Sequence, residues 1–379
     1  MIRKRKRAAL RVVYCASEPH EPLSVPLANE LSKLCSLLLI VSYPRNKTRP
    51  VQAHRSSKFV EAGVLNHTIQ RKGRSRSPIQ LFYDCILVNQ LMRFKPDVAI
   101  IDGVESPYLL LFYPLMRLWH IHVIFVAHNV VPHSGFGNLF YELFKWLSIR
   151  IADDVLVFSK NQSHVLWNKY HIRGLMVPHP YIDFYEHFYR ERKIGREPCT
   201  ILFFGVIRPN KGLEILIQAA EAARNQIPNL KVIIAGECPD FSRYRGSIRT
   251  PSMFELHLER IPDEEVGMFF LRSQFLVLPY HDATQSGPLM ISLGFNCPVI
   301  ASNVGSFAEF IDSGETGLLF EKGNSEELAE SIVFLLTHMD ILKRMQEISR
   351  QRVSQNFSVS SVAHRLLDIS FEACSKQSG

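Results

Sequence analysis

One stretch of the chain, residues 199–223, limits the possible fold more than any other part of the sequence. It begins with the apolar run CTILFF, which is typical of a buried β-strand and ends at Gly205. A polar loop follows, and after Gly212 the sequence LEILIQAAEAA has the periodicity of an amphipathic helix. A strand, a short loop and a helix in this order predict a parallel α/β sheet.

Short apolar runs alternate with helical segments along the whole chain. The predicted strands are residues 11–16, 37–43, 98–102, 123–127, 199–205, 231–235, 275–279 and 297–301. The predicted helices are residues 27–34, 81–94, 107–119, 213–223, 325–336, 339–357 and 359–371. This alternation favours doubly wound parallel sheets, and 379 residues are too many for one core, so we expect two domains.

Composition and cysteine usage indicate a folded protein of a reducing compartment. Hydrophobic residues make up 46% of the chain and charged ones 21%, and the seven cysteines never occur as Cys-x-x-Cys. We therefore expect neither zinc nor disulfides, and a cytoplasmic location. The most apolar region, residues 108–126, is interrupted by Arg117, so neither a transmembrane span nor a cleaved signal peptide is predicted.

The net charge of +8 is concentrated in two basic clusters, residues 3–7 and 71–76. No helix-turn-helix or RNA-binding signature accompanies them, which disfavours nucleic acid as a partner. Basic clusters beside apolar segments are typical of proteins that bind an anionic membrane surface. A plain solvated surface is the alternative interpretation.

Two loops have the residues needed to bind a diphosphate. Arg208 and Lys211 follow a strand, where a guanidinium and an ammonium can together hold phosphate oxygens. Ser286 and Gly287 precede Pro288 at the start of a helical segment, and the amides of a helix N-terminus favour an anion. The alternative interpretations are solvated loop cations and an ordinary helix-to-strand connection.

His128 and His133 follow another predicted strand, residues 123–127. A His at the carboxyl end of a parallel strand lies where α/β sheets bind ligands. The alternative interpretations are that His128 only bonds the next loop and that His133 is a surface residue of a mobile loop. Residues 17–26, after the first strand, lack the G-x-G-x-x-G of a dinucleotide site, which argues against an NAD-dependent dehydrogenase.

The region 280–320 resembles the signature of the retaining glycosyltransferases of family 4. The shared features are Pro298-Val299, the turn 304–309 that ends in Glu309, and the segment 314–319. The two Glu of the family's Glu-x7-Glu motif are replaced here by Ala283 and Ile291. The resemblance implies the GT-B fold, with two facing Rossmann-like doubly wound parallel-sheet domains.

The resemblance also implies domain roles and site residues. Residues 1–190 would bind the acceptor, 191–358 would bind the nucleotide sugar, and the helix 359–379 would cross back to the first domain. His128 would lie beside the transferred sugar, while Arg208 and Lys211 would hold the diphosphate. The other implied donor-binding residues are Gly205, Asn210, Arg260, Ile261, Asp282, Thr284, Gln285, Ser286, Gly287, Pro288 and Glu309.

The function expected from this resemblance is transfer of a sugar, with retention, from a GDP- or UDP-sugar to a glycan or lipid-linked acceptor. The product would be an exopolysaccharide, a lipopolysaccharide or a glycolipid made at the cytoplasmic face of a membrane. No metal or other cofactor is expected, since Arg208 and Lys211 supply the charge that stabilises the leaving diphosphate. Two alternatives stay open: a GT-B nucleotide-sugar epimerase, and a non-catalytic relative that only binds nucleotide sugar.

Overall fold

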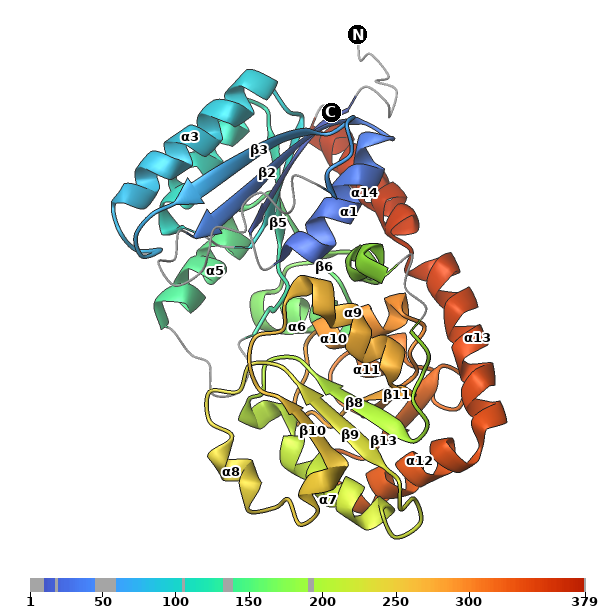
Figure 1. The fold of residues 1–379 in the computed structure, drawn as a ribbon. Coiled ribbons are helices and arrows are strands. Elements are labelled where there is room, and N and C mark those ends of the chain that lie inside the picture. Colours follow the sequence, from blue (N-terminus) through green and yellow to red (C-terminus); the bar gives the residue numbers. More distant parts are fainter. Residues whose placement is uncertain are drawn as a thin grey trace. The chain divides into compact units, whose positions relative to one another are not determined.

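The structure, a computed structural model, describes residues 10–17, 20–44, 59–103, 106–131, 139–189 and 194–377 (Figure 1). The basic cluster 3–7 and His133 lie outside these residues. The chain divides into two compact units. The first contains residues 1–132, 136–180 and 358–379, and the second residues 133–135 and 181–357. The sequence placed the boundaries at 190/191 and 358/359 instead.

The first unit is built on a seven-stranded sheet in the order β3-β2-β1-β4-β5-β6-β7. Every neighbouring pair in it is parallel. Its strands are β1 (Arg11–Ser17), β2 (Ser36–Pro44), β3 (Leu65–Arg71), β4 (Val98–Asp102), β5 (His122–Val126), β6 (Asp154–Val157) and β7 (Leu175–Met176). The central strand β4 is buried along its whole length, as expected for a parallel strand covered on both faces.

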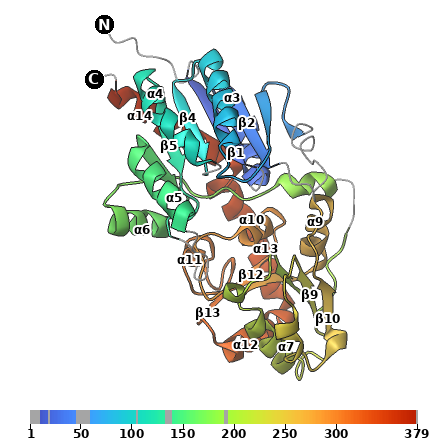
Figure 2. The same ribbon diagram turned by 90° about the vertical axis from the view of Figure 1, so that its left-hand side faces the viewer.

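Helices cover both faces of this sheet (Figure 2). Helices α1 (Glu21–Ser32) and α14 (Val359–Gln377) pack on one face, where Leu27 and Val362 join the core. The other face is covered by α3 (Ile79–Phe94), the 3₁₀-helix η3 (Pro107–Phe112) and α4 (Tyr113–Leu118). Helices α5 (Leu139–Ile151) and α6 (Lys160–Tyr170) continue the helical layer along the chain.

The second unit repeats this design with a six-stranded parallel sheet in the order β10-β9-β8-β11-β12-β13. Its strands are β8 (Thr200–Phe204), β9 (Lys231–Ala235), β10 (Phe254–His257), β11 (Phe275–Leu278), β12 (Val299–Ser302) and β13 (Gly317–Phe320). Its helices are α7 (Leu213–Ala223), α8 (Ser242–Arg245), α9 (Asp263–Arg272), α10 (Gly287–Gly294), α11 (Phe307–Phe310), α12 (Ser325–Thr337) and α13 (Met339–Asn356). The prediction of two doubly wound α/β sheets is confirmed.

Two sequence predictions in the first unit were wrong. Helix α1 begins at Glu21, six residues earlier than predicted, because proline is tolerated in a first helical turn and the following turn buries Val25 against the sheet. The expected helix 107–119 is instead η3 followed by α4. A proline inside a helix clashes with the carbonyl four residues earlier, and Pro114 lies at the start of α4.

Strand β3 was not predicted, because only its last residues face the core. Its final residue, Arg71, was assigned to an exposed basic cluster but is only 5% exposed, and its Nη1 donates to Asp84 Oδ1 at 2.8 Å. Burial raises the pKa of Asp84, and the charge and hydrogen bond of Arg71 oppose that rise. Arg71 is therefore a structural residue, while Lys72, Arg74 and Arg76 are exposed.

We predict that Asp84→Asn lowers the free energy of unfolding by about 3 kcal/mol, because it leaves the buried guanidinium of Arg71 without a counter-charge. Chemical denaturation of the full chain measures this change. The control is Glu259→Gln, which removes an exposed carboxylate and should change stability by less than about 0.5 kcal/mol. Equal stability of the two variants would contradict the structural role of the pair.

Candidate functional site

The strand order of the first sheet reverses between β1 and β4. From β1 the chain continues to β2 on one side, and from β4 it continues to β5 on the other. The connections that leave these two strands therefore diverge, and the crevice between them at the carboxyl edge is where open α/β sheets bind ligands. Polar side chains gather at this point.

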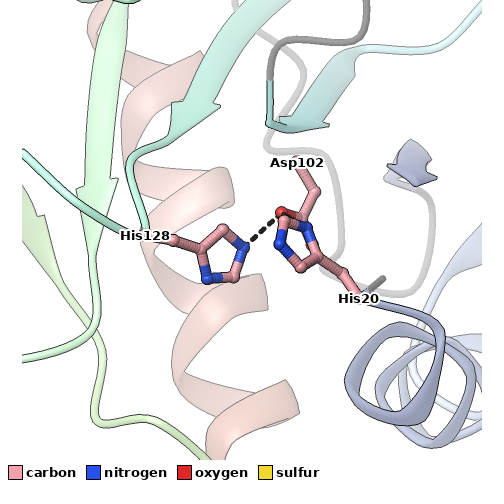
Figure 3. Close-up of side chains that lie close together, drawn as sticks. All are labelled: His20, Asp102 and His128. Carbon is pink, nitrogen blue, oxygen red and sulfur yellow. Dashed lines mark hydrogen bonds and ion pairs between the residues drawn. The ribbon is translucent and has the colours of Figure 1, made fainter. Parts of the chain in front are cut away.

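Three of these side chains are in direct contact (Figure 3). Asp102 is the last residue of β4, His20 immediately precedes α1, and His128 follows β5. The Nε2 atom of His128 lies 2.5 Å from Asp102 Oδ1, and the Nδ1 atom of His20 lies 3.0 Å from the same oxygen. The centres of the two imidazole rings are 3.9 Å apart. We call this group the His-Asp-His cluster.

The carboxylate of Asp102 is the centre of the cluster. It has no exposed side-chain surface, and its second oxygen, Oδ2, accepts a hydrogen bond from the Tyr14 hydroxyl at 2.9 Å. Burial would raise the pKa of Asp102, but the charges and hydrogen bonds of His128 and His20 outweigh burial and hold the pKa well below its usual value. Asp102 is thus a buried anion that fixes both imidazole rings.

The cluster can orient a ligand and exchange protons with it. His20 and His128 keep 28% and 16% of their side-chain surface exposed, so a bound hydroxyl group can reach them. Their ligating atoms and that of Asp102 lie within 4.8 Å of one another, and this donor set also suits a transition metal. The same oxygen of Asp102 accepts a hydrogen bond from each of the two rings.

The sequence predicted His128 but neither of its partners. Asp102 was included only as the end of the strand VAIID, although a carboxylate that closes a fully apolar strand is a signal for a site. His20 was missed because residues 17–26 were interpreted as a loop without a binding motif.

A fourth residue, His179, lies near the cluster and is neutral. Its ring centre is 5.0 Å from that of Phe158, which in turn is 5.3 Å from that of His128. Its Nδ1 donates to the carbonyl oxygen of Pro180 at 2.7 Å. Burial lowers the pKa of His179 to about 4, so the neutral imidazole packs as an apolar wall.

The strand order of the second sheet reverses between β8 and β11. The loop after β8 contains Gly205, Arg208, Asn210 and Lys211, and the loop after β11 contains residues 279–286. Both loops thus leave the carboxyl edge at the position where a ligand is expected. The structure brings most of the predicted donor-binding residues to one place in this unit.

Cations project from the first of these loops. Arg208 is exposed and has extended backbone, and the 3₁₀-turn Pro209–Lys211 follows it. The Nζ atom of Lys211 lies 3.7 Å from the ring centre of Tyr280, a cation–π contact that holds the ammonium over the second loop. Gly212 has a φ of +63°, and a Cβ there would lie 1.9 Å from the carbonyl oxygen of Pro279. Only glycine allows this approach.

Hydrogen bonds tie the two loops together. The amide of His281 donates to the carbonyl oxygen of Asn210 at 2.9 Å, and the Nδ2 of Asn210 donates to Asp282 Oδ1 at 3.4 Å. His281 also pairs with Glu214 at 2.7 Å. Asp282 and Asn210 are therefore placed at the same point as Arg208 and Lys211.

The N-terminus of α10 completes this edge. Ser286 caps the helix, its Oγ accepting from the amide of Leu289, and Pro288 occupies the first turn. Gly287 is exposed, and a Cβ built on it would meet no atom within 4 Å, so space for a ligand exists beside its backbone. Gln285 is partly buried and Thr284 is buried in the preceding loop.

The turn 303–306 has a structural role. The hydroxyl of Ser306 donates to the carbonyl oxygen of Thr284 at 2.6 Å. A Cβ on Gly305 would lie 1.6 Å from the carbonyl oxygen of Ala283. Ala283 and Ile291, the residues predicted to stand at the two motif Glu positions, are 7% and 6% exposed. Carboxylates at these positions would be costly to bury without partners.

Three predicted residues follow other strands of the sheet. Glu309 is half-buried on α11, after β12. Arg260 and Ile261 follow β10, the edge strand, which is two strands away from β8. Arg260 is exposed and Ile261 partly buried. Their roles in donor binding remain predictions.

Comparison with known proteins identifies the fold. The chain matches a crystal structure of a glycosyltransferase from Rickettsia africae with a TM-score of 0.70, over 96% of this chain and 98% of the other, at 16% identity. The chain has the GT-B fold. A second GT-B match is Anabaena HepE in complex with UDP and glucose, with a TM-score of 0.70 over 95% and 99% of the two chains, at 13% identity.

Comparison of the sequence with known families and proteins gives partial matches. Residues 186–352 match the family described as glycosyl transferases group 1. An uncharacterized glycosyltransferase of Methanocaldococcus jannaschii is 31% identical over 161 residues, which are 41% of this chain and 43% of that protein. The capsular polysaccharide biosynthesis glycosyltransferase CapM of Staphylococcus aureus is 25% identical over 171 residues, 44% of each. The chain thus spans less than half the length of these relatives.

The neutral state of His179 makes stability depend on pH. Between pH 6.5 and about 4 the unfolded chain binds a proton at this residue and the native state does not, so stability falls as the pH falls. We predict a loss of about 3 kcal/mol across this window, measured by denaturation at several pH values. His179→Phe should remove that part of the loss, whereas the exposed control His164→Gln should retain it. The same slope in both variants would contradict burial of a neutral ring.

Proposed function

We propose that the chain is a glycosyltransferase that moves a sugar from a nucleotide-diphosphate sugar, linked to GDP or UDP, to a glycan or lipid-linked acceptor. The observation that carries this proposal is that Arg208, Lys211 and the start of α10 follow β8 and β11, between which the strand order of the second sheet reverses. Two cations and a helix N-terminus are suited to a diphosphate, the group that leaves in such a transfer. The UDP in the HepE structure supports this donor class.

Each group has a role in this reaction. Arg208 bonds two phosphate oxygens, Lys211 adds a point charge, and the amide of Gly287 faces the same anion. Asn210 and Asp282, joined to each other, face the donor from the two loops. These groups supply the charge stabilisation that the leaving diphosphate needs, so we propose that the transfer requires no metal.

His128 acts on the sugar side of the reaction. Asp102 holds its ring at a fixed orientation, and the imidazole can therefore bond a sugar hydroxyl without prior reorganisation. His20, held by the same carboxylate, provides a second such contact. Both histidines then position the substrate at the carboxyl edge of the first sheet.

The remaining parts of the proposal concern stereochemistry and location. The resemblance to family 4 implies transfer with retention, in which the departing phosphate oxygen takes the acceptor proton. The CapM similarity supports an acceptor of polysaccharide synthesis. The seven cysteines never occur as Cys-x-x-Cys, which supports a reducing, cytoplasmic location. We place the reaction at the cytoplasmic face of a membrane.

The test is acceptor-dependent release of nucleoside diphosphate from UDP- and GDP-sugars, in the presence of EDTA. Release that needs the acceptor is expected. Release without acceptor would indicate an epimerase, and no release with any donor would indicate a binding protein. Proton NMR of the product then gives the anomeric configuration. An inverted linkage would contradict retention but not the transfer of a sugar.

We predict that Lys211→Ala lowers turnover at least ~10²-fold, because a preorganised charge at the diphosphate is lost. The matched control is Lys322→Ala, which removes an exposed lysine from another loop of the same unit and should leave turnover unchanged. Circular dichroism checks that both variants fold. Full activity of Lys211→Ala would remove this residue from the diphosphate site.

A further inference from the structure

Large hydrophobic side chains are exposed along consecutive helices of the first unit. On η3 and α4, Leu111, Leu115 and Leu118 are 63%, 40% and 73% exposed, and on α5, Leu143 and Trp146 are 49% and 41% exposed. We call these five residues the apolar face. Exposed apolar residues are common singly, but a group of them marks an interaction surface.

The spacing of these residues shows that each group forms a stripe. Leu115 and Leu118 of α4 are three residues apart, and Leu139, Leu143 and Trp146 of α5 are separated by four and three residues. Residues at this spacing share one side of a helix. The opposite sides already supply the core, through residues such as Met116 and Ile149, which are buried. Packing inside the unit therefore does not account for the stripes.

The two stripes belong to one helical layer. The guanidinium of Arg117, on α4, donates to Asp153 Oδ1 at 2.7 Å and to the carbonyl oxygen of Ile151, the last residue of α5, at 2.9 Å. Figure 2 shows α4 and α5 on the same side of the first sheet. The hydrogen bonds fix the end of α5 next to α4.

Basic residues border this layer. The exposed Lys72, Arg74 and Arg76 lie between β3 and α3, and the Arg76 guanidinium lies 4.1 Å from the ring centre of Phe140, on α5. Arg150, also on α5, is exposed. The basic loop is therefore adjacent to the helix that carries Leu143 and Trp146.

The nearby acidic residues do not cancel this charge, since each already has a basic partner. Glu142 pairs with Lys145 at 2.8 Å, and Asp153 pairs with Arg117 at 2.7 Å. The layer thus combines apolar stripes with surplus positive charge.

We propose that the apolar face docks on a membrane rich in anionic lipid, with Leu143, Trp146 and Leu118 in the headgroup region. Tryptophan is favoured at this depth, and Lys and Arg side chains near an anionic surface add electrostatic attraction. Among the described residues no helix is both long and apolar enough to cross a bilayer. This inference extends the proposal that the acceptor is lipid-linked, but the membrane contact itself does not depend on sugar transfer.

The experiment is co-sedimentation of the full chain with phosphatidylcholine vesicles that contain, or lack, phosphatidylglycerol. The wild type should bind the anionic vesicles, and added salt should weaken binding. The double variant Leu143→Glu/Trp146→Glu should bind at least ~10-fold more weakly, because it removes two apolar groups and adds negative charge. Lys72→Gln/Arg74→Gln should weaken binding to anionic vesicles only.

The matched control is Phe334→Glu/Met339→Glu, which changes two hydrophobic residues of the second unit that are each 38% exposed. It should bind like the wild type. No binding by the wild type, or equal binding by both double variants, would overturn the proposal. So would a wild-type dimer that Leu143→Glu/Trp146→Glu converts to a monomer without loss of vesicle binding, because the face would then contact protein. Turnover on a water-soluble acceptor should be the same in all these variants, which separates this test from that of the sugar transfer.

Discussion

The chemistry of the first unit depends on one buried negative charge at the end of its central strand. An uncompensated carboxylate in such a position would be costly, and Asp102 is compensated by three donors that come from separate segments of the chain. The strand order brings those segments to one edge, because the chain turns in opposite directions after β1 and β4. The sheet therefore positions the donors, and the donors offset the free-energy cost of burying the carboxylate.

The second unit uses the same topology for a different electrostatic purpose. Where its strand order reverses it has cations and a helix N-terminus, whereas the first unit has a buried anion and two imidazoles at the corresponding place. The cation–π contact of Lys211 and the bond from Asn210 to Asp282 preset these groups before any ligand arrives. Groups that are already oriented lose little freedom on binding, which is the condition for strong stabilisation of a developing charge.

The sequence predicted the parts of the structure that rest on local pattern. Strands such as β4 and β9 are continuous apolar runs, and the glycines at 205 and 212 mark the loop between β8 and α7. It failed where a partner distant in the chain decides the outcome. Arg71 looks like a surface charge until Asp84 is placed beside it, and His20 gains its role only through Asp102. Helix α1 was predicted to begin only at residue 27, although burial of Leu23 and Val25 stabilises its first turns. The sequence also did not predict that the stripes on α4 and α5 are exposed, because an apolar helix has the same residue pattern whether one side of it is covered or both.

The placement of α14 has a consequence for how the protein is made. Val362, Ala363 and Leu366 belong to the same hydrophobic core as β1 and α1, yet the whole second unit is synthesised before them. During translation the first sheet would leave the ribosome with one face incompletely covered, and it would wait in that state while residues 181–357 emerge. The newly made first unit would therefore expose apolar surface to which a chaperone can bind. The second unit can complete its folding first.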